Sequence, residues 1–195
     1  MGDLVFLKLG PRRGCVRATS AIEHYERGLA LESTDPDAAM AAYQRALSAR
    51  PDLADAYNNL GRLCHDRADS LAVSGGRNTD AVSGGRNTDA VPRVSGRCRQ
   101  LADAEAFYRQ ALCVDVNVAL YWFNLGVALE DQGRCAEAIT AYERSLALDP
   151  HFADAHFNLA RQLEVAGTRG PLCDELVLRR AVRHLKRYRD LVRAG

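Results

Sequence analysis

The stretch that decides the fold is YWFNLGVALEDQGRCAEAITAYERSLALDP, residues 121–150. Its apolar residues recur at intervals of three and four, from Trp122 through Leu125 to Leu129 and again after Gly133. That spacing places them on one face of each of two amphipathic helices. Gly133 ends the first helix and Pro150 follows the second, as expected for helix stop signals. The stretch therefore predicts a helical hairpin.

The same pattern recurs along the chain. Residues 119–152 align with the stretch from 153 onward at a period of 34, so that Asn124 matches Asn158. An earlier copy that contains Asn59 aligns at an offset of 65, which is one period and 31 inserted residues. A repeat of this length indicates a solenoid, in which each hairpin buries its apolar side against its neighbours.

Residues 121–150 also carry, in order, a large aromatic residue, Leu-Gly, a turn Gly, an Ala, a second aromatic, a small residue and Pro. This order resembles the tetratricopeptide repeat family. The resemblance implies an all-α fold, a right-handed α-solenoid of about four hairpins. We expect a tetratricopeptide domain at residues 20–192 after a poorly ordered N-terminal extension at 1–19. The expected repeats cover residues 20–53, 54–118, 119–152 and 153–192.

Two insertions interrupt the repeats. Residues 67–100 contain AVSGGRNTD twice in succession, at 72–80 and 81–89, and their Gly, Ser, Asn and Asp content predicts a disordered loop. A shorter insertion is expected at residues 168–175. The duplicated stretch comes close to a calcium-binding nonapeptide repeat. Calcium-binding repeats of this kind form a β-roll that needs several stacked turns, and two copies are too few. We therefore favour a duplicated loop.

Composition narrows the class of protein. Lys and Arg number 26 against 25 Asp and Glu, and 47% of the residues are apolar, which excludes wholesale disorder and a nucleic-acid binder that relies on bulk charge. The six cysteines include no pair at the spacing of structural zinc sites. No apolar run approaches the length of a membrane span and residues 1–10 show no export signal. We therefore expect a cytoplasmic protein with reduced thiols.

Sequence motifs for catalysis are missing as well. The chain shows no phosphate-binding loop, nucleophile elbow or HExxH motif, and its five histidines are scattered. His156 stands where the repeat has a large aromatic residue, so we interpret it as a packing residue. We expect no enzyme activity, no cofactor, no metal ligand, no small-molecule substrate and no membrane contact.

The expected binding site comes from the resemblance. In the family, the first helix of each repeat lines a concave groove, and the Asn before Leu-Gly can form a ladder that binds the backbone of an extended peptide. Such an amide suits this task because it donates and accepts hydrogen bonds at once. Alternatively, the asparagines only support the hairpins. The ladder positions are Asn59, Asn124 and Asn158, and the neighbouring groove positions are Asn58, Arg62, Phe123, Val127, Glu130, Phe157 and Arg161.

Two other binding modes are open. Chaperone-binding members of the family use a clamp for a terminal carboxylate, to which Asn58, Arg62, Asn124 and Arg161 could contribute here, although the usual lysines are missing. The last helix, expected at residues 176–192, has an apolar stripe opposite a basic one. We expect it to cap the solenoid, and a contact with an acidic partner or nucleic acid is the alternative. The apolar stripe consists of Leu178, Val182, Leu185, Tyr188 and Val192.

The sequence thus predicts a non-catalytic, cytoplasmic interaction module that presents a concave groove to a peptide or protein partner. The stretches GDLVFLKL, HYERGLALESTDPDAAMAAYQRAL and ADAYNNLGRLCHD are also similar to the C-terminal repeat region of bacterial MerR-type regulators. That resemblance implies a bacterial regulator part without its DNA-binding domain, because 19 residues cannot hold a winged helix. We therefore expect no nucleic-acid contact in this chain. An arm of a glycosyltransferase-like enzyme is the third hypothesis.

Overall fold

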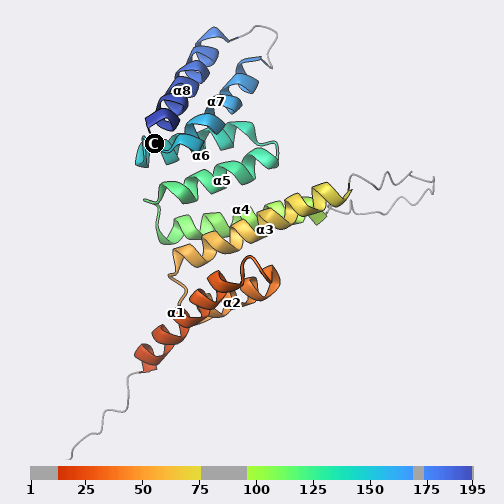
Figure 1. Ribbon diagram of the computed structural model, residues 1–195, viewed down its shortest axis with the longest axis vertical. Helices are drawn as coiled ribbons and strands as arrows, with labels where there is room; N and C mark the ends of the chain where they lie inside the picture. The colour runs from red at the N-terminus through yellow and green to blue at the C-terminus, as the bar shows by residue number, and fades with distance from the viewer. Residues whose placement is uncertain (1–12, 76–95, 169–173, 195) are drawn as a thin grey trace, which may run out of the picture.

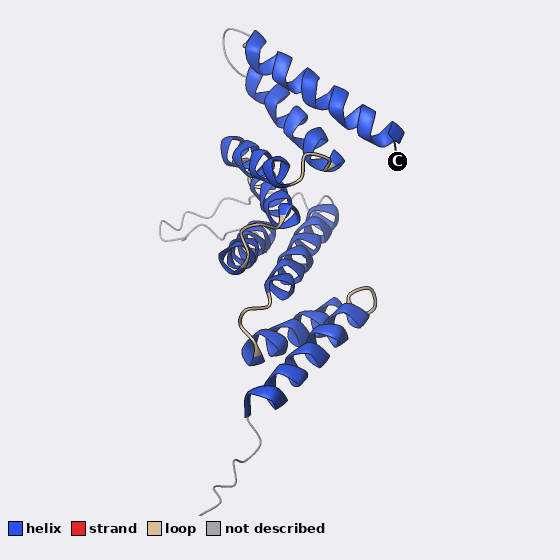
Figure 2. Cartoon of the chain, turned by 90° about the vertical axis from the view of Figure 1, so that its left-hand side faces the viewer, coloured by secondary structure: helices blue, strands red, loops and turns tan. Residues whose placement is uncertain are grey.

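The computed structural model describes residues 13–75, 96–168 and 174–194. Within these ranges the chain forms eight α-helices and no strand, and the helices stack in chain order along the long axis (Figures 1 and 2). They pair as four hairpins, which confirms the predicted α-solenoid. The helices are α1 (Arg13–Leu31), α2 (Pro36–Ala49), α3 (Ala54–Gly75), α4 (Gly96–Val114), α5 (Ala119–Asp131), α6 (Cys135–Leu148), α7 (Ala153–Thr168) and α8 (Glu175–Ala194).

The predicted insertion is shorter than the sequence suggested. Residues 67–75 continue α3 and residues 96–100 begin α4, so the loop prediction is wrong at both ends. Ala68 and Leu101 explain this, because they are 0% and 1% exposed and extend the apolar contact between the two helices. The remaining part of that prediction, residues 76–95, lies outside the described residues.

The two other boundary predictions also need correction. Residues 13–19 belong to α1 and not to an unstructured extension, whereas residues 1–12 are not described. In the fourth hairpin, residue 168 ends α7 and residue 175 begins α8, and residues 169–173 lie outside the described residues. A glycine near a helix end usually stops the helix, but Gly167 lies inside α7, where the Leu178 side chain packs against it.

Local signals explain the other helix ends. The Asp35 side chain accepts a hydrogen bond from the Ala38 N–H at 3.0 Å, and Pro36 takes the first helical position, which is a typical helix start. Gly133 has φ 75°, a left-handed conformation that ends the first helix of the third hairpin. Pro51 and Pro150 lie just beyond α2 and α6.

The two helices of each of the first three hairpins approach closely at a glycine. A tyrosine of the second helix lies flat against this glycine of the first helix, and an added Cβ would come within 2.5–2.6 Å of the ring. Only glycine leaves room for these rings, which are nearly fully buried. The pairs are Gly28 with Tyr43, Gly61 with Tyr108 and Gly126 with Tyr142.

The buried residues form two core clusters, which the partly buried Met40 and Phe107 link. Leu60, Leu125 and Leu159 occupy the same position in successive first helices and are 0%, 3% and 0% exposed. In addition to the contacts between consecutive helices, α3 touches α5 directly. This contact places α3 and α5 on the same side of the stack. No helix in the described ranges combines the length and apolar character needed to cross a lipid bilayer.

The last helix is rotated relative to our expectation. Val182 and Val192 are 64% and 58% exposed, so these members of the apolar stripe predicted for α8 do not pack on α7. Leu178 and Tyr188 of the same stripe do pack on α7, against Gly167 and Phe157. Ala181 is the buried residue, and His184 meets the buried His156 with 2.8 Å between the two Nδ1 atoms. This pairing sets the rotation of α8 and confirms His156 as a packing residue.

Candidate functional site

The first helices of the second, third and fourth hairpins present side chains in the same register on the inner side of the stack. Each stripe begins with a residue at the helix start and continues through the predicted ladder asparagine to a residue one turn later. In α3 the stripe is Asp55, Asn59 and Arg62, in α5 it is Leu120, Asn124 and Val127, and in α7 it is Asp154, Asn158 and Arg161. We call these nine residues the inner face.

At the junction between the first and second hairpins, five side chains form a polar cluster. The Tyr43 hydroxyl donates to Glu32 Oε1 at 2.6 Å, and Arg62 holds the other carboxylate oxygen. Asn59 Nδ2 donates to the Tyr43 hydroxyl at 3.3 Å and to the Tyr25 hydroxyl at 3.4 Å. Burial and the Glu32 carboxylate raise the pKa of Tyr43, so its hydroxyl stays protonated as a donor.

The junction between the third and fourth hairpins repeats this cluster. The Tyr142 hydroxyl donates to Glu130 Oε2 at 2.8 Å, and Arg161 Nη2 lies 3.4 Å from Glu130 Oε1. Asn158 Nδ2 donates to the Tyr142 hydroxyl at 3.5 Å. Both the Asn and the Arg of this cluster lie 99 positions after their counterparts. Burial and the Glu130 charge likewise raise the pKa of Tyr142.

These two clusters show what the ladder asparagines do within the chain. Asn59 and Asn158 each use Nδ2 to hold a tyrosine of the preceding hairpin, which is a supporting role. Neither side-chain carbonyl oxygen accepts a hydrogen bond from a residue in the described ranges. Each asparagine therefore supports the stack and keeps an acceptor for a peptide N–H.

The middle junction is different. Asn124 Nδ2 donates to Asn58 Oδ1 at 2.8 Å, and Asn58 is only 6% exposed. The prediction that Asn58 lines an open groove is therefore wrong, because the third hairpin packs over it. For the same reason Asn58 cannot contribute to a carboxylate clamp.

The two phenylalanines predicted as groove residues also differ in access. Phe123 is half-buried and packs against Phe152 and Tyr142, with ring centroids 4.7 and 5.8 Å away. Phe157 is 38% exposed, lies 5.1 Å from the Tyr188 ring, and has the Arg161 guanidinium 5.9 Å from its centroid. Val127 is half-buried against the core. Phe157 is thus the accessible aromatic residue beside Asn158 and Arg161.

The arginines on the inner face keep unused hydrogen-bonding capacity. The side chains of Arg62 and Arg161 are 42% and 54% exposed, and the glutamates that hold them are 19% and 18% exposed. A guanidinium has five N–H donors, and one carboxylate uses at most two. Arg62 also lies 3.5 Å from Asp66 Oδ2. Each arginine is therefore fixed in place and keeps N–H donors that these carboxylates do not use.

Sequence reasoning missed an ion-pair network beside this face. His65 Nε2 lies 2.6 Å from Asp131 Oδ2, and Arg97 Nη2 lies 3.7 Å from the other oxygen. The hydrogen bond that His65 donates to Asp131 raises the pKa of His65 and lowers the pKa of Asp131. The 66 positions between these partners hide the pair from any local pattern.

Asp69 completes a group that could hold a metal ion, since ligand atoms of His65, Asp69 and Asp131 lie within 4.8 Å of one another. The geometry favours an ion pair instead. Asp131 faces Nε2 of the imidazole, whereas Asp69 lies 3.8 Å from Nδ1 on the other side of the ring. One imidazole nitrogen cannot share a metal ion with both carboxylates in this arrangement.

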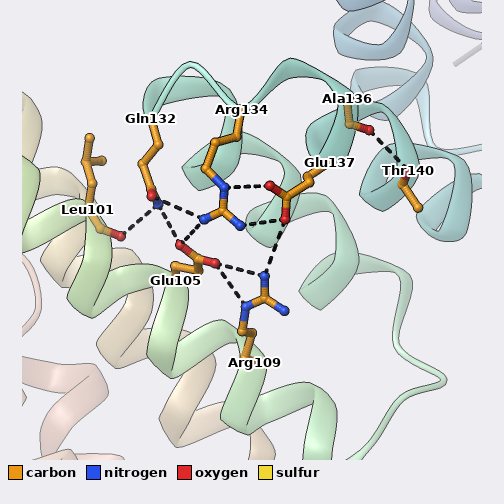
Figure 3. A network of polar contacts seen from close by, with 8 residues as sticks. All are labelled: Leu101, Glu105, Arg109, Gln132, Arg134, Ala136, Glu137 and Thr140. Atoms are coloured by element: carbon orange, nitrogen blue, oxygen red, sulfur yellow. Dashed lines mark hydrogen bonds and ion pairs between the residues drawn. The ribbon is translucent and has the colours of Figure 1, made fainter.

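A second network joins the second and third hairpins on the side of α4 and α6 (Figure 3). Glu105 is its centre, because Oε2 accepts from Arg134 Nη1 at 2.7 Å and Gln132 Nε2 at 3.0 Å, and Oε1 accepts from Arg109. Arg134 also bonds both oxygens of Glu137. Burial opposes the charge on Glu105, but its hydrogen bonds outweigh burial and lower its pKa. This network is structural.

Comparisons with known proteins agree with this architecture. Two tetratricopeptide repeat family profiles match the chain, one at residues 119–152 and one at residues 28–83. The peroxisomal targeting signal receptors of Kluyveromyces lactis and Saccharomyces cerevisiae are 47% and 45% identical over 53 residues. That match covers 27% of this chain and 9% of each receptor.

Solved structures share the fold at low sequence identity. MamA superposes with a TM-score of 0.62 at 15% identity, over 89% of this chain and 79% of MamA. The tetratricopeptide domain of Arabidopsis OM64 gives 0.54 at 17% identity, over 76% of this chain and 98% of that domain. The first such domain of Spaghetti (RPAP3), solved with the HSP90 peptide SRMEEVD, gives 0.53 at 18% identity, over 77% and 96%. With its repeated hairpins and two matching profiles, the chain is a tetratricopeptide repeat protein.

Proposed function

We propose that the inner face binds an extended segment of a partner protein and that the chain is a non-catalytic protein-interaction module. The observation that carries this proposal is the repeated cluster, which holds an asparagine and an arginine at matched places in α3 and α7. An extended backbone offers N–H and carbonyl groups along its length. The asparagine carbonyls and arginine N–H groups supply the complementary partners.

Apolar side chains add an anchoring contact. Phe157 and Leu120 are 38% and 44% exposed on the first helices that carry the asparagines. Burying either side chain under a ligand contributes about 1.5–3 kcal/mol, whereas one hydrogen bond contributes about 0.5–1.5 kcal/mol. Affinity therefore depends mainly on the aromatic and aliphatic contacts, and the polar groups set the direction and register of the segment.

The related proteins support a peptide ligand. One structural neighbour is a tetratricopeptide domain bound to an HSP90 peptide, and the matched receptors are named for a targeting signal. The chain spans only 9% of each receptor. The similarity to the receptors therefore does not identify the partner of this chain, and an experiment is needed to do so. The regulator and glycosyltransferase hypotheses stay predictions, since no comparison and no described residue favours them.

We further propose a cytoplasmic, bacterial protein. Cys64 is buried and Cys113 is exposed, and both are thiols. Burial raises the pKa of Cys64 to about 11, so this thiol is unreactive at neutral pH. An exposed thiol such as Cys113 suits a reducing compartment.

A displayed library of random peptides, selected on the purified chain, tests the proposed binding face. Selected peptides are then titrated against Phe157→Ala and Asn158→Ala by fluorescence anisotropy. Phe157→Ala should weaken binding at least about tenfold and Asn158→Ala about fivefold. The matched control is Asn117→Ala, in the exposed turn between α4 and α5. Equal affinity for all four proteins would refute binding at the inner face.

A further inference from the structure

The outward surface of α8 is unlike the rest of the chain. The helix, ELVLRRAVRHLKRYRDLVRA, has seven Lys and Arg against two acidic residues, whereas the whole chain has a net charge of +1. Large apolar side chains lie exposed among these charges. They are Leu176, Val182, Leu185 and Val192, which are 73%, 64%, 39% and 58% exposed.

Comparison with the other hairpins shows what these positions normally do. In the first three hairpins the second helix is covered by the first helix of the next one, as α6 is by α7. Aligning Ala181 of α8 with Ala138 of α6 places Leu185 at the position of Tyr142 and Val182 at that of Ile139. Tyr142 is 0% exposed, and Ile139 packs against the core. Tyr142 packs on Gly126 of its own hairpin, so its burial does not depend on a following helix. In α8 the side chains of Val182 and Leu185 are exposed, and no helix in the described ranges covers them.

The charge around this surface restricts what can cover it. Arg179 and Arg180 are neutralised locally by Glu175 and Glu143. In contrast, Arg183 and Lys186 form no ion pair with any residue in the described ranges, and both are exposed. A covering helix therefore gains from acidic side chains beside its apolar stripe.

A second copy of this chain matches this surface only in part, because its α1 exposes Arg27 beside Glu23 and Glu26. The corresponding outward face belongs to α1, which has Arg27 at the position of the buried Leu60 and Leu125. Arg27 is exposed there and would be placed against the basic surface of α8. Two copies of α8 would repel each other for the same reason. A helix that is acidic along its polar side complements Arg183 and Lys186 more fully than α1 or α8 does.

We propose that the outward surface of α8, centred on Val182, Leu185, Arg183 and Lys186, docks an acidic amphipathic helix of another protein. The apolar stripe of that helix would cover the exposed side chains of Val182 and Leu185. Its Asp or Glu residues would pair with Arg183 and Lys186. This contact is separate from the inner face and does not depend on it.

The probe is a fluorescent helical peptide of about 18 residues, long enough to form a helix in water. It carries Leu at helical spacing and Glu elsewhere, and a matched peptide carries Lys in place of Glu. Anisotropy titration should show binding of the acidic peptide and none of the basic one. Arg183→Glu with Lys186→Glu should weaken binding at least about tenfold. Val182→Ser with Leu185→Ser should weaken it by a similar factor.

The matched control is Arg45→Glu with Arg99→Glu, which changes the net charge equally on the exposed sides of α2 and α4. Circular dichroism confirms that every variant is folded. Equal weakening by both charge variants would mean nonspecific attraction and would overturn the proposal. Concentration-dependent self-association in sedimentation would overturn it in favour of a second copy. Binding to phosphatidylserine vesicles without binding to the acidic peptide would overturn it in favour of a membrane surface.

Discussion

Replacing Gly126 by Ala tests the close contact that defines each hairpin. The added methyl would lie 2.6 and 2.7 Å from two ring carbons of Tyr142. That is roughly 1 Å closer than the optimal carbon–carbon separation of about 3.5–4.0 Å. The ring cannot swing away easily, because Tyr142 is 0% exposed and its hydroxyl is bonded to Glu130.

The expected magnitude follows from two opposing terms. Overpacking of this kind costs about 1–3 kcal/mol, and Ala in place of Gly inside a helix contributes about 1 kcal/mol of stability. Because three ring carbons crowd the methyl and the ring is fixed, we expect a net loss of about 1–2 kcal/mol in the free energy of unfolding. For a chain of this size that corresponds to a fall of roughly 2–8 °C in Tm.

Urea denaturation followed by circular dichroism measures this loss. The control is Gly96→Ala, whose Cβ would meet only the terminal Cδ1 of Leu71, at 3.4 Å, and which should be neutral. In a Tyr142→Leu background, which removes the ring, Gly126→Ala should no longer destabilise the protein. Gly126→Ala at or above the stability of the unaltered chain would refute the close-packing argument.

Three further predictions concern stability. Trp122→Ala should lower the free energy of unfolding, measured by urea denaturation, by about 2–3 kcal/mol. This is below the range for a fully buried Trp, because Trp122 is half-buried and its Nε1 donates to the Val116 carbonyl at 2.9 Å. A change within about 0.5 kcal/mol would contradict this prediction. Glu105→Gln should cost about 1 kcal/mol, since it weakens the bonds to Arg134 and Arg109, and an unchanged denaturation midpoint would argue against the network. His65→Gln should lower the free energy of unfolding by about 1–2 kcal/mol, and only within a limited pH range. The His65 pKa is raised and the Asp131 pKa is lowered, so the stability from this pair is present between about pH 4 and 6.5. It is lost as the pH rises through the raised His65 pKa or falls through the lowered Asp131 pKa, and a pH-independent difference between the two proteins would contradict the pairing.

The repeat pattern was enough to predict the four hairpins, because a 34-residue period repeats the same contacts at each turn. It also predicted the helix end at Gly133, which depends on local backbone geometry. It did not predict the burial of Asn58, because that depends on how the third hairpin lies over the second. The rotation of α8 was also missed, since the contact between His156 and His184 spans 28 positions.

The candidate site was predicted in part. The helical spacing identified the register of Asn59, Asn124 and Asn158, and the structure places them in matching stripes. The clusters that hold Arg62 and Arg161 could not be read from the sequence, because each joins residues about 30 positions apart from two hairpins. Only the fold brings such glutamates and arginines together.

The central claim is that one extended segment lies along the inner face and contacts both clusters. The most direct measurement is anisotropy titration of one selected peptide against Arg62→Ala, Arg161→Ala and the two changes combined, with Arg45→Ala and Arg99→Ala as controls. We predict that each inner-face variant weakens binding about threefold to tenfold and that the combined variant weakens it further, whereas the controls bind as the unaltered chain does. Unchanged affinity in the combined variant, or a loss seen only with Arg183→Glu and Lys186→Glu, would contradict the claim.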